Sequence, residues 1–541
     1  MCWTGCGGSG VAAGVLVAIV VVPFAAGLVA WITPTRLAQA VTVGAGVATF
    51  ALSLVLVAAA GTRGEMAVGG WLRADALSLV FLLSTTFLYA VTAVFSVGYL
   101  HGGDDPADDA RYARRLYAGL NFFCWAMAIT PVVNSLVLVW AALEIASAVS
   151  ALLVAIDGTD GAAEASWKYL LIASMGLGIA LFGTVAMYAA GAAALGPAYR
   201  MAIGPLLASA HRLPAGLVRL AYLLAVLGFG TKMGLVPVHT WLPDAHSEAP
   251  TPVSALLSGS LLAVSFYAIL RYFQITGRAL GYAFPREVLL AFGIASLTLA
   301  ALYVVSQRDL KRLLAYSSIE HMGIMAIGMS FAAPLAVVGV LIQVMAHAAA
   351  KGTAFFGAGS VMRKLGTKDL RRIRGGIGLL PWTGPMLVLA VLALSAAPPF
   401  GIFRSELMIV AGGLSVPSDG TVAVLVGLVT LAFLGLSWWA SQTMLSPTPR
   451  TEAEAGAPAG GRPVPVASGG ADTGPPAGPV ALGDPEPGAG AGSRLTKGET
   501  SAWMVGAMLA GLGALVLLGV HPPGSLDHLL SRAAAELGVG R

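Results

Sequence analysis

The stretch GTKMGLVPVHTWLPDAHSEAPTPVSALLSG, residues 230–259, contains the pattern that decides the fold. It begins inside an apolar run that starts near residue 220, and it ends inside another that continues to about residue 274. Pro237 and a polar elbow, residues 239–250, lie between the two runs. A hydrocarbon core about 30 Å thick is crossed by roughly 20 apolar residues of helix. The stretch therefore predicts two membrane-spanning helices, and proline interrupts the first.

The composition of the whole chain is that of a membrane protein. Hydrophobic residues make up 57% of the 541 residues, charged residues make up 11%, and the mean hydropathy is +0.82. Soluble domains carry about 25% charged residues, which excludes a water-soluble globular fold. The net charge of +5 predicts no nucleic-acid partner, because cytoplasmic loops of membrane proteins are commonly rich in Lys and Arg.

Apolar runs of spanning length predict an all-α polytopic protein with about fourteen transmembrane helices. The runs lie near 11–31, 37–60, 76–99, 117–134, 135–156, 168–192, 216–246, 250–274, 287–307, 311–331, 334–361, 378–413, 420–445 and 499–520. No basic residue precedes the first run, so we expect a retained helix rather than a signal peptide.

Basic residues in the loops predict the orientation. The segments 111–115, 308–312 and 363–374 carry most of the Lys and Arg and would lie on one face of the membrane. The positive-inside rule places that face in the cytoplasm and both termini outside the cell membrane. Residues 447–498 are rich in Pro, Gly, Ala and Ser, which predicts a disordered cytoplasmic loop.

Ionisable residues within predicted spans are candidates for function, because each costs about 2.5–3.5 kcal/mol on insertion scales. Glu144 is the only charged residue in 136–153, and Lys232 is the only one between 220 and 237. Burial disfavours the charged form of both groups, and an opposite charge nearby favours it. A Glu and a Lys in this setting can load and release a proton. The alternatives are a Glu144 that bonds neighbouring serines and a Lys232 that extends to the membrane surface.

Two further positions show the same pattern. His347 and Lys351 are four residues apart in the apolar run 335–356, so they share one helix face and their titrations should be coupled. The alternative is a structural role, in which His347 and Lys351 make polar contacts with Gln343 and the backbone. Glu406 follows Pro398 and Pro399, which predict a second broken helix. Paired helix breaks in two halves of a transporter indicate an internal repeat with ion sites at the breaks.

The sequence predicts no metal site and no cofactor. Cys2, Cys6 and Cys124 do not have metal-ligand spacing, and His239 and His246 do not match the HExxH pattern. The chain also lacks a Cys cluster or Gly-rich nucleotide loop that would hold a redox centre. The two histidines are better interpreted as titratable groups of the polar elbow.

Five motifs resemble the proton-translocating antiporter-like membrane subunits of complex I, Mrp cation/proton antiporters and nickel–iron hydrogenases. Besides residues 230–259, they are WAALEIASAVSALLV (140–154), WKYLLIASMGLGIALFG (167–183), RDLKRLLAYSSIEHMGIM (308–325) and PPFGIFRSELMI (398–409). The resemblance extends over residues 75–445 and is strongest to the membrane subunit of hydrogenase 4 and formate hydrogenlyase. It implies two inverted five-helix repeats and two broken helices.

The resemblance also implies roles for particular residues. Proton translocation would use Glu144, Lys232, His347, Lys351 and Glu406, and the helix breaks would lie at Pro237, Pro398 and Pro399. Further relay or gating candidates are His239, His246, Lys168, Glu320 and His321. One position departs from the family pattern, since Ala263 stands where a lysine is common. A relay between the two repeats would then need water, Ser265, Tyr267 or another group.

These expectations give a domain organisation and a function. We expect N-terminal helices over 1–116, repeats over 117–275 and 276–446, the loop over 447–498, and a last helix with a tail over 499–541. The chain would translocate protons, with sodium as an alternative, as a subunit of a multisubunit oxidoreductase. Its partners would be other membrane subunits, a peripheral redox arm and the lipid bilayer. The rival interpretations are a subunit of a cation/proton antiporter and a scaffold that does not pump.

Overall fold

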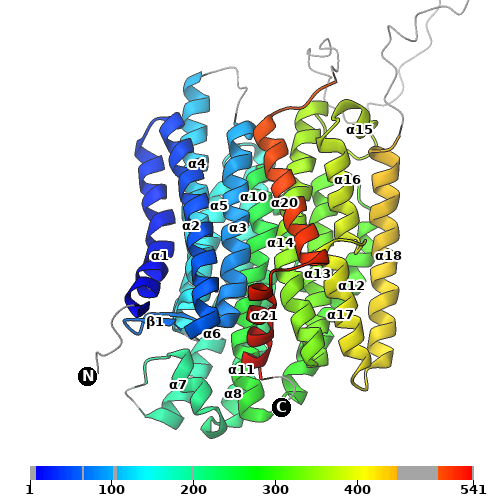
Figure 1. Ribbon diagram of the computed structural model, residues 1–541. Coiled ribbons are helices and arrows are strands. Elements are labelled where there is room, and N and C mark those ends of the chain that lie inside the picture. The colour runs from blue at the N-terminus through cyan, green and yellow to red at the C-terminus, as the bar shows by residue number, and fades with distance from the viewer. Residues whose placement is uncertain (1–7, 64–65, 101–105, 197–198, 447–496, 539–541) are drawn as a thin grey trace, which may run out of the picture.

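The computed structural model describes residues 8–63, 66–100, 106–196, 199–446 and 497–538. These residues form a bundle of long, roughly parallel helices (Figure 1). Eleven helices of the described chain are long and apolar enough to cross a membrane. Helices α4 and α13, together with the interrupted pair α16 and α17, complete a set of fourteen spans. The prediction of an all-α polytopic fold is confirmed.

The N-terminal part holds three helices and one hairpin. The elements are α1 (Gly8–Ile32), α2 (Thr35–Arg63), β1 (Met66–Val68), β2 (Leu72–Ala74) and α3 (Ala76–Tyr99). Strands β1 and β2 pair antiparallel, with Met66 opposite Ala74. This hairpin was not predicted from the sequence, because three-residue strands carry too short an alternation to be recognised.

The first five-span repeat extends from α4 to α11. Its elements are α4 (Pro106–Ile129), η1 (Thr130–Val132), α5 (Leu136–Val154), α6 (Asp160–Leu195), α7 (Ile203–Ala208), η2 (Ala210–Arg212), α8 (Ala215–Met233), α9 (Trp241–Glu248), α10 (Thr251–Leu256), the π-helical turn η3 (Leu257–Leu261) and α11 (Leu262–Leu280). Helices α8 and α9 are the two halves of one broken span, whereas α10, η3 and α11 are continuous.

The second repeat has the corresponding order. Its elements are α12 (Ala283–Val304), α13 (Leu310–Phe331), α14 (Pro334–Leu365), α15 (Gly376–Leu379), α16 (Thr383–Leu394), α17 (Gly401–Leu414) and α18 (Asp419–Thr443). In each repeat the fourth span is the broken one, and each broken span packs on the third span of its own repeat, α8 on α6 and α17 on α14. The two breaks coincide with cis peptide bonds at Val236–Pro237 and Pro398–Pro399.

Two helices complete the chain, α20 (Ala502–Val520) and the amphipathic α21 (Gly524–Glu536). Helix α21 lies across α3 and α14 at the end of the bundle where α1 begins (Figure 1). The opposite end carries α15 and the start of α4 (Figure 1). Apart from residues 497 and 498, the predicted loop 447–498 lies outside the described residues.

Several helices are longer than their apolar runs. Helix α4 begins at Pro106 rather than near residue 117, and α6 begins at Asp160 rather than near residue 168. The extra turns carry charged residues such as Arg111 and Glu164, which cannot lie in hydrocarbon but continue a helix into water. Hydropathy thus locates the membrane-embedded part of a helix and underestimates its length.

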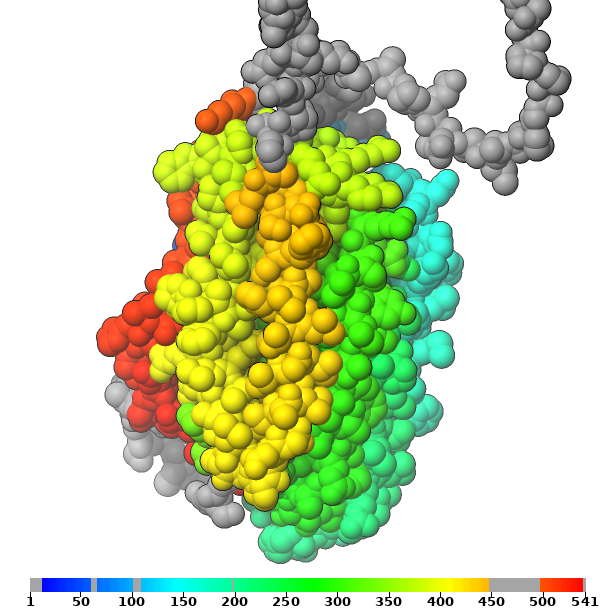
Figure 2. Space-filling model, turned by 90° about the vertical axis from the view of Figure 1, so that its right-hand side faces the viewer, coloured from blue at the N-terminus to red at the C-terminus, as the bar shows by residue number. Residues whose placement is uncertain are grey.

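The two flanks of the bundle expose large apolar side chains. Helix α18 lies on one flank, alongside α12 (Figure 2), and exposes Leu434 and Trp438. Helix α6, which belongs to the first repeat, exposes Trp167, Met175 and Phe182. Such surfaces face lipid or another membrane protein.

Candidate functional site

Lys232 occupies the last turn of α8 and is fully buried. Its Nζ donates a hydrogen bond of 2.5 Å to the hydroxyl of Tyr169 on α6. The Tyr169 hydroxyl lies 2.6 Å from Oγ of Ser150 on α5. Nζ is also 5.5 Å from the centre of the Trp241 ring on α9, where it gains a cation–π attraction. The lysine therefore joins both halves of the broken span to α5 and α6.

The break itself leaves few backbone groups unsatisfied. Gly234 takes a left-handed conformation after α8 and closes the helix, and the indole of Trp241 donates to the carbonyl of Thr231 at 2.7 Å. The amide of Val236 donates to Oγ of Ser296 on α12 at 2.9 Å. Free backbone groups at membrane depth are tolerated only in surroundings of this kind. The sequence of the elbow thus keeps Lys232 at a helix end within the bundle.

Glu144 lies on α5 near the flank formed by α6. Its carboxylate accepts a hydrogen bond of 3.1 Å from Ser174 of α6. No hydrogen bond or ion pair joins Glu144 to Lys232 among the described contacts, and Lys232 is instead bonded to Tyr169, which contacts Ser150. The Ser147 and Ser150 hydroxyls instead donate to carbonyls of their own helix.

A second polar cluster surrounds the break of the other repeat. The rings of His321 on α13 and His347 on α14 meet edge to face with centres 5.1 Å apart. Nδ1 of His321 is 3.0 Å from Nε2 of Gln343 and 3.9 Å from the Glu406 carboxylate. Gln343 also donates to Glu406 at 3.4 Å and accepts from the hydroxyl of Ser405. Three spans therefore contribute to one connected network.

Lys351 extends this cluster by one helical turn. It is fully buried, and its Nζ donates to the backbone carbonyl of Leu314 on α13 at 2.8 Å. His347 shares its helix face, and neither ring nitrogen of His347 has a hydrogen-bond partner among the described residues. Glu320 is also buried, with Oε2 unpartnered within the described structure. Unpartnered buried polar atoms are uncommon in proteins and need an explanation, such as an unseen water molecule or a catalytic role.

Glu406 reaches the flank covered by α18. It lines a cavity of about 210 Å³ between α17 and α18, whose other walls are apolar except for Thr430. The predicted helix break after Pro399 therefore places this carboxylate at the side of the bundle. Glu144 and Glu406 come from the two repeats and lie next to the two exposed flanks.

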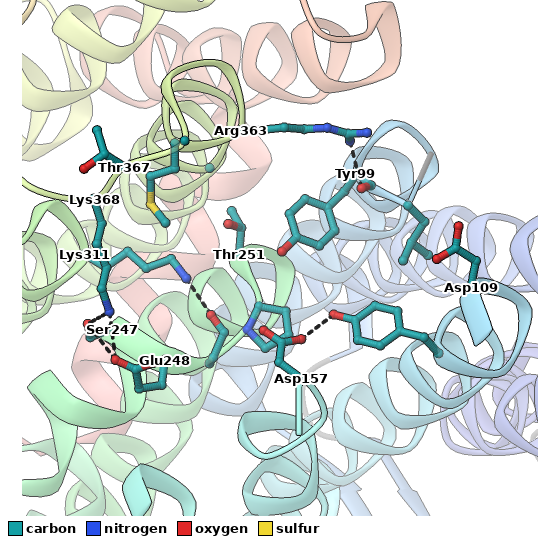
Figure 3. A pocket seen from close by; sticks show the side chains of 17 residues that line it. Tyr99, Asp109, Asp157, Ser247, Glu248, Thr251, Lys311, Arg363, Thr367 and Lys368 are labelled. Atoms are coloured by element: carbon teal, nitrogen blue, oxygen red, sulfur yellow. Dashed lines mark hydrogen bonds and ion pairs between the residues drawn. The ribbon is translucent and has the colours of Figure 1, made fainter. Parts of the chain in front are cut away.

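A polar vestibule opens at the end of the bundle that carries α15 (Figure 3). It has a volume of about 630 Å³ and is lined by Tyr99, Asp109, Tyr112, Asp157, Ser247, Glu248, Thr251, Lys311, Arg363 and Lys368, among others. Tyr112 donates to Asp157 at 2.7 Å, and the nearly buried Lys311 donates to the carbonyl of Ala249 at 2.6 Å (Figure 3). The charges of the wall are mixed, and the vestibule lies beside the end of α9.

Three further relay candidates, His239, His246 and Lys168, differ in burial. His246 is fully buried on α9, stacks on Phe355 of α14 at 5.2 Å, and has no partner for either ring nitrogen among the described residues. His239 is nearly buried and lies in the break before α9. Lys168, in contrast, is half exposed and pairs with Glu164 and Asp244. The structure thus places Lys168 at the surface, away from the buried clusters.

The groups proposed to replace a lysine at position 263 have other partners. Ala263 is buried in α11, and Ser265 donates only to the Leu261 carbonyl of its own helix. The hydroxyl of Tyr267 donates to the carbonyl of Pro131 and also accepts from Arg271. Neither side chain connects the two buried clusters.

Comparison with known proteins identifies the family. Residues 133–448 match the family described as NADH:quinone oxidoreductase/Mrp antiporter, TM, and this range holds both helix breaks and both polar clusters. The chain belongs to this family. Its members are antiporter-like membrane proteins, and the resemblance inferred from the motifs is confirmed.

Curated relatives place the chain within the antiporter-like family. It is 37% identical over 368 residues to a hydrogenase-4 component F homolog of Methylacidiphilum infernorum, covering 67% of this chain and 76% of the relative. It is 30% identical over 433 residues to NADH-quinone oxidoreductase subunit N of Desulforudis audaxviator, covering 77% and 84%. Both relatives are named as components of multisubunit complexes.

Chains of three solved membrane complexes share the fold. A chain of an archaeal membrane-bound sulfane sulfur reductase superposes with a TM-score of 0.78 at 19% identity, covering 97% of both chains. A chain of Thermus thermophilus respiratory complex I gives 0.75 at 20% identity, covering 97% of this chain and 99% of that chain. A chain of the Mrp complex from Dietzia gives 0.78 at 19% identity, with 97% of both covered.

Proposed function

We propose that this chain translocates protons as a membrane subunit of a multisubunit oxidoreductase, most closely of the hydrogenase 4 or complex I type. The observation that carries the proposal is the pair of buried titratable clusters at matched helix breaks, one around Lys232 and one around Lys351 and Glu406. Groups that exchange protons at these positions would form a polar chain from Glu144 to Glu406. The repeats over 117–275 and 276–446 would each carry half of it.

The vestibule supports an aqueous entrance for protons at the end of the bundle that carries the basic loops. Ser247, Glu248 and Ala249 line it directly after His246 in sequence. His246 would then be the first buried base that a proton meets, and a neutral imidazole offers one ring nitrogen as an acceptor. Under the positive-inside rule this face is cytoplasmic, which would leave both termini on the outside of the cell membrane.

Partner subunits would supply the energy and the chemistry. The exposed flanks at α6 and α18 fit other membrane subunits, and the two candidate carboxylates Glu144 and Glu406 lie beside those flanks. A peripheral redox arm would hold the electron carriers, and its reaction would bias the protonation of the chain through the coupling between sites. A subunit of a cation/proton antiporter is the second candidate, favoured by the likeness to the Mrp family.

The test is proton uptake by the full-length chain in sealed lipid vesicles with an internal pH-sensitive dye, under an imposed potassium diffusion potential. We expect Glu144→Gln to abolish uptake, because the amide can neither bind nor release the proton. The matched control is Glu164→Gln, which removes an exposed carboxylate on α6 and should leave uptake unchanged. Equal uptake by wild type and Glu144→Gln vesicles would refute proton translocation through this site and favour a scaffold.

A further inference from the structure

The two buried clusters need a connection that the charged residues do not provide. Lys232 belongs to the first cluster and Lys351 to the second, and the span formed by α10, η3 and α11, the last of the first repeat, contacts α14 of the second repeat. Within that continuous span the only charged side chain before Arg278 is Arg271, which is bound to Asp75 at the opposite end of the bundle from the vestibule. The stretch 254–260 instead carries three serines, Ser254, Ser258 and Ser260.

Ser258 lies in the π-helical turn η3 and faces the second repeat. Its Oγ is 2.7 Å from Oγ of Ser318 on α13, and both side chains are fully buried. Either hydroxyl can be the donor. π-Helical turns are rare and are frequent at functional sites. The turn thus presents one hydroxyl of the first repeat directly to one hydroxyl of the second.

Ser318 is connected to Lys351 through a shared acceptor. Oγ of Ser318 lies 3.0 Å from the carbonyl oxygen of Leu314, and Nζ of Lys351 lies 2.8 Å from the same oxygen. Two donors on one oxygen lie within about 6 Å of each other. A change in the flexible side-chain torsions of the lysine is therefore enough to bring its ammonium group onto the Ser318 hydroxyl.

On the side of the first repeat, Ser258 is connected to the polar elbow through Ser254. Ser254 precedes Ser258 by one helical turn, so the two share a helix face. Oγ of Ser254 donates to the carbonyl of His246 at 3.0 Å and lies 3.3 Å from that of Ala249. His246 stacks on α14, the helix that carries Lys351, and its ring nitrogens have no partners among the described residues. The serine pair is thus connected through Ser254 to the backbone of His246, and through the Leu314 carbonyl to Lys351.

We propose that Ser258 and Ser318 form the proton-transfer link between the two repeats, in place of an ionisable side chain at position 263. The Lys351 ammonium gives a proton to Oγ of Ser318, which passes its own hydroxyl proton to Oγ of Ser258. The proton of Ser258 leaves through one water molecule to a ring nitrogen of His246. Lys351 becomes neutral, His246 becomes charged, and both hydroxyls are regenerated. This inference rests on the proposed proton translocation.

The test uses the full-length chain in the same vesicle assay. The double variant Ser258→Ala/Ser318→Ala removes both hydroxyls, and we expect its proton uptake to fall by about a hundredfold, as for loss of a proton-transfer group. Ser258→Thr/Ser318→Thr keeps both hydroxyls and should recover most of the uptake. Ser265→Ala is the matched control, since Ser265 is equally buried on α11 but bonds only to its own helix.

A purely structural role of the pair predicts different results. If the serines only hold two helices together, the alanine double variant lowers the thermal midpoint of the purified chain, and the bulkier threonines do not restore uptake. Wild-type uptake in the double variant would also overturn the link, even with Glu144→Gln inactive. Failure of the proposed function is recognised separately, because then Glu144→Gln and wild type would behave alike. The link is supported by lost uptake at an unchanged midpoint with recovery in the threonine variant.

Discussion

At the scale of single residues, the buried ionisable groups fall into two kinds. Some are held by several polar partners, as in the ion pair between Asp75 and Arg271. Nη2 of Arg271 lies 2.5 Å from the Asp75 carboxylate, and Tyr267 and Ser78 accept from the same guanidinium. Others, such as His246 and His347, have buried nitrogens without partners among the described residues. The first kind stabilises the fold, and the second kind includes the groups for which we propose proton transfer.

The Asp75 carboxylate depends on its cations. Burial alone would raise the pKa of Asp75, but the charge and hydrogen bond of Arg271 and the charge of Arg73 hold it well below the usual range. Arg271→Gln would leave the carboxylate buried and poorly compensated, at a cost of about 3–5 kcal/mol. We expect a clearly lower thermal midpoint of the purified chain, whereas Arg219→Gln, an exposed arginine on α8, should have little effect. Equal midpoints for the two variants would contradict this account.

The sequence indicates some of these residues and not others. Charged side chains in apolar runs are costly, so Glu144, Lys232, Lys351 and Glu406 are recognisable without a structure; their role in translocation stays a prediction. Tyr169 and the serine pair carry no such signal, because hydroxyl groups are common in membrane helices and usually bond to their own backbone. Only the spatial pairing of η3 with α13 distinguishes Ser258 and Ser318.

At the scale of elements, the broken spans are predicted by proline, but their docking is not. Helix α9 is held at the vestibule by side chains from distant segments. Lys368, in the loop after α14, lies 2.8 Å from Glu248 and 3.5 Å from Asp309. The Ser247 hydroxyl also donates to Asp309 at 2.9 Å. Residues more than a hundred positions apart thus form one clamp, which no local pattern in the sequence indicates.

The clamp at Lys368 should have a defined pH dependence. Burial lowers the pKa of Lys368, but the hydrogen bond to Glu248 and the charge of Asp309 outweigh it and raise the pKa above its ordinary value of 10.5. A folded-state pKa above the unfolded one stabilises the clamp fully below the ordinary value, and the stabilisation is lost as the pH rises through the raised pKa. As the pH rises from neutral, the loop should therefore stay attached and detach only above about pH 10.5.

A spin label on Arg372→Cys, an exposed position in the same loop, measures this directly. Label mobility should be constant between pH 6 and 9 and increase only in strong alkali, whereas Lys368→Gln should be mobile already at pH 7. A transition in the wild-type protein near neutral pH would show that another group controls the clamp.

At the scale of the whole molecule, the number of spans and the fold class follow from hydropathy and helix breaks. The loop helices α7 and η2, the hairpin and the amphipathic α21 could not be predicted this way, because each is shorter than a span and has mixed polarity. They lie at the ends of the bundle and cap it, as the contacts of α21 with α3 show. Hydropathy predicts the part of the chain that lies in lipid, but it does not predict the short elements that cap the bundle.

Orientation is a property of the whole molecule and can be measured. In a chain with Cys2 and Cys6 replaced by serine, Ser531→Cys on the exposed face of α21 should react with a membrane-impermeant maleimide in intact cells. Arg372→Cys on the basic face should react only after permeabilisation. Reversed labelling would place the basic loops outside and overturn the predicted orientation.

The contact between α21 and α3 has a consequence for biogenesis. The carboxylate of Glu536 accepts hydrogen bonds from the amides of Ala76 and Leu77, the first residues of α3, across 460 and 459 positions of sequence. Gln274 and Arg278 in turn donate to the Glu536 carbonyl. During synthesis these amides and side chains lack their acceptor until Glu536 is translated, after α20, the last candidate span of the described residues. A nascent chain released before that point would lack the hydrogen bonds by which Glu536 joins α3 to the first repeat. A membrane protease or chaperone could recognise such a chain as incompletely folded.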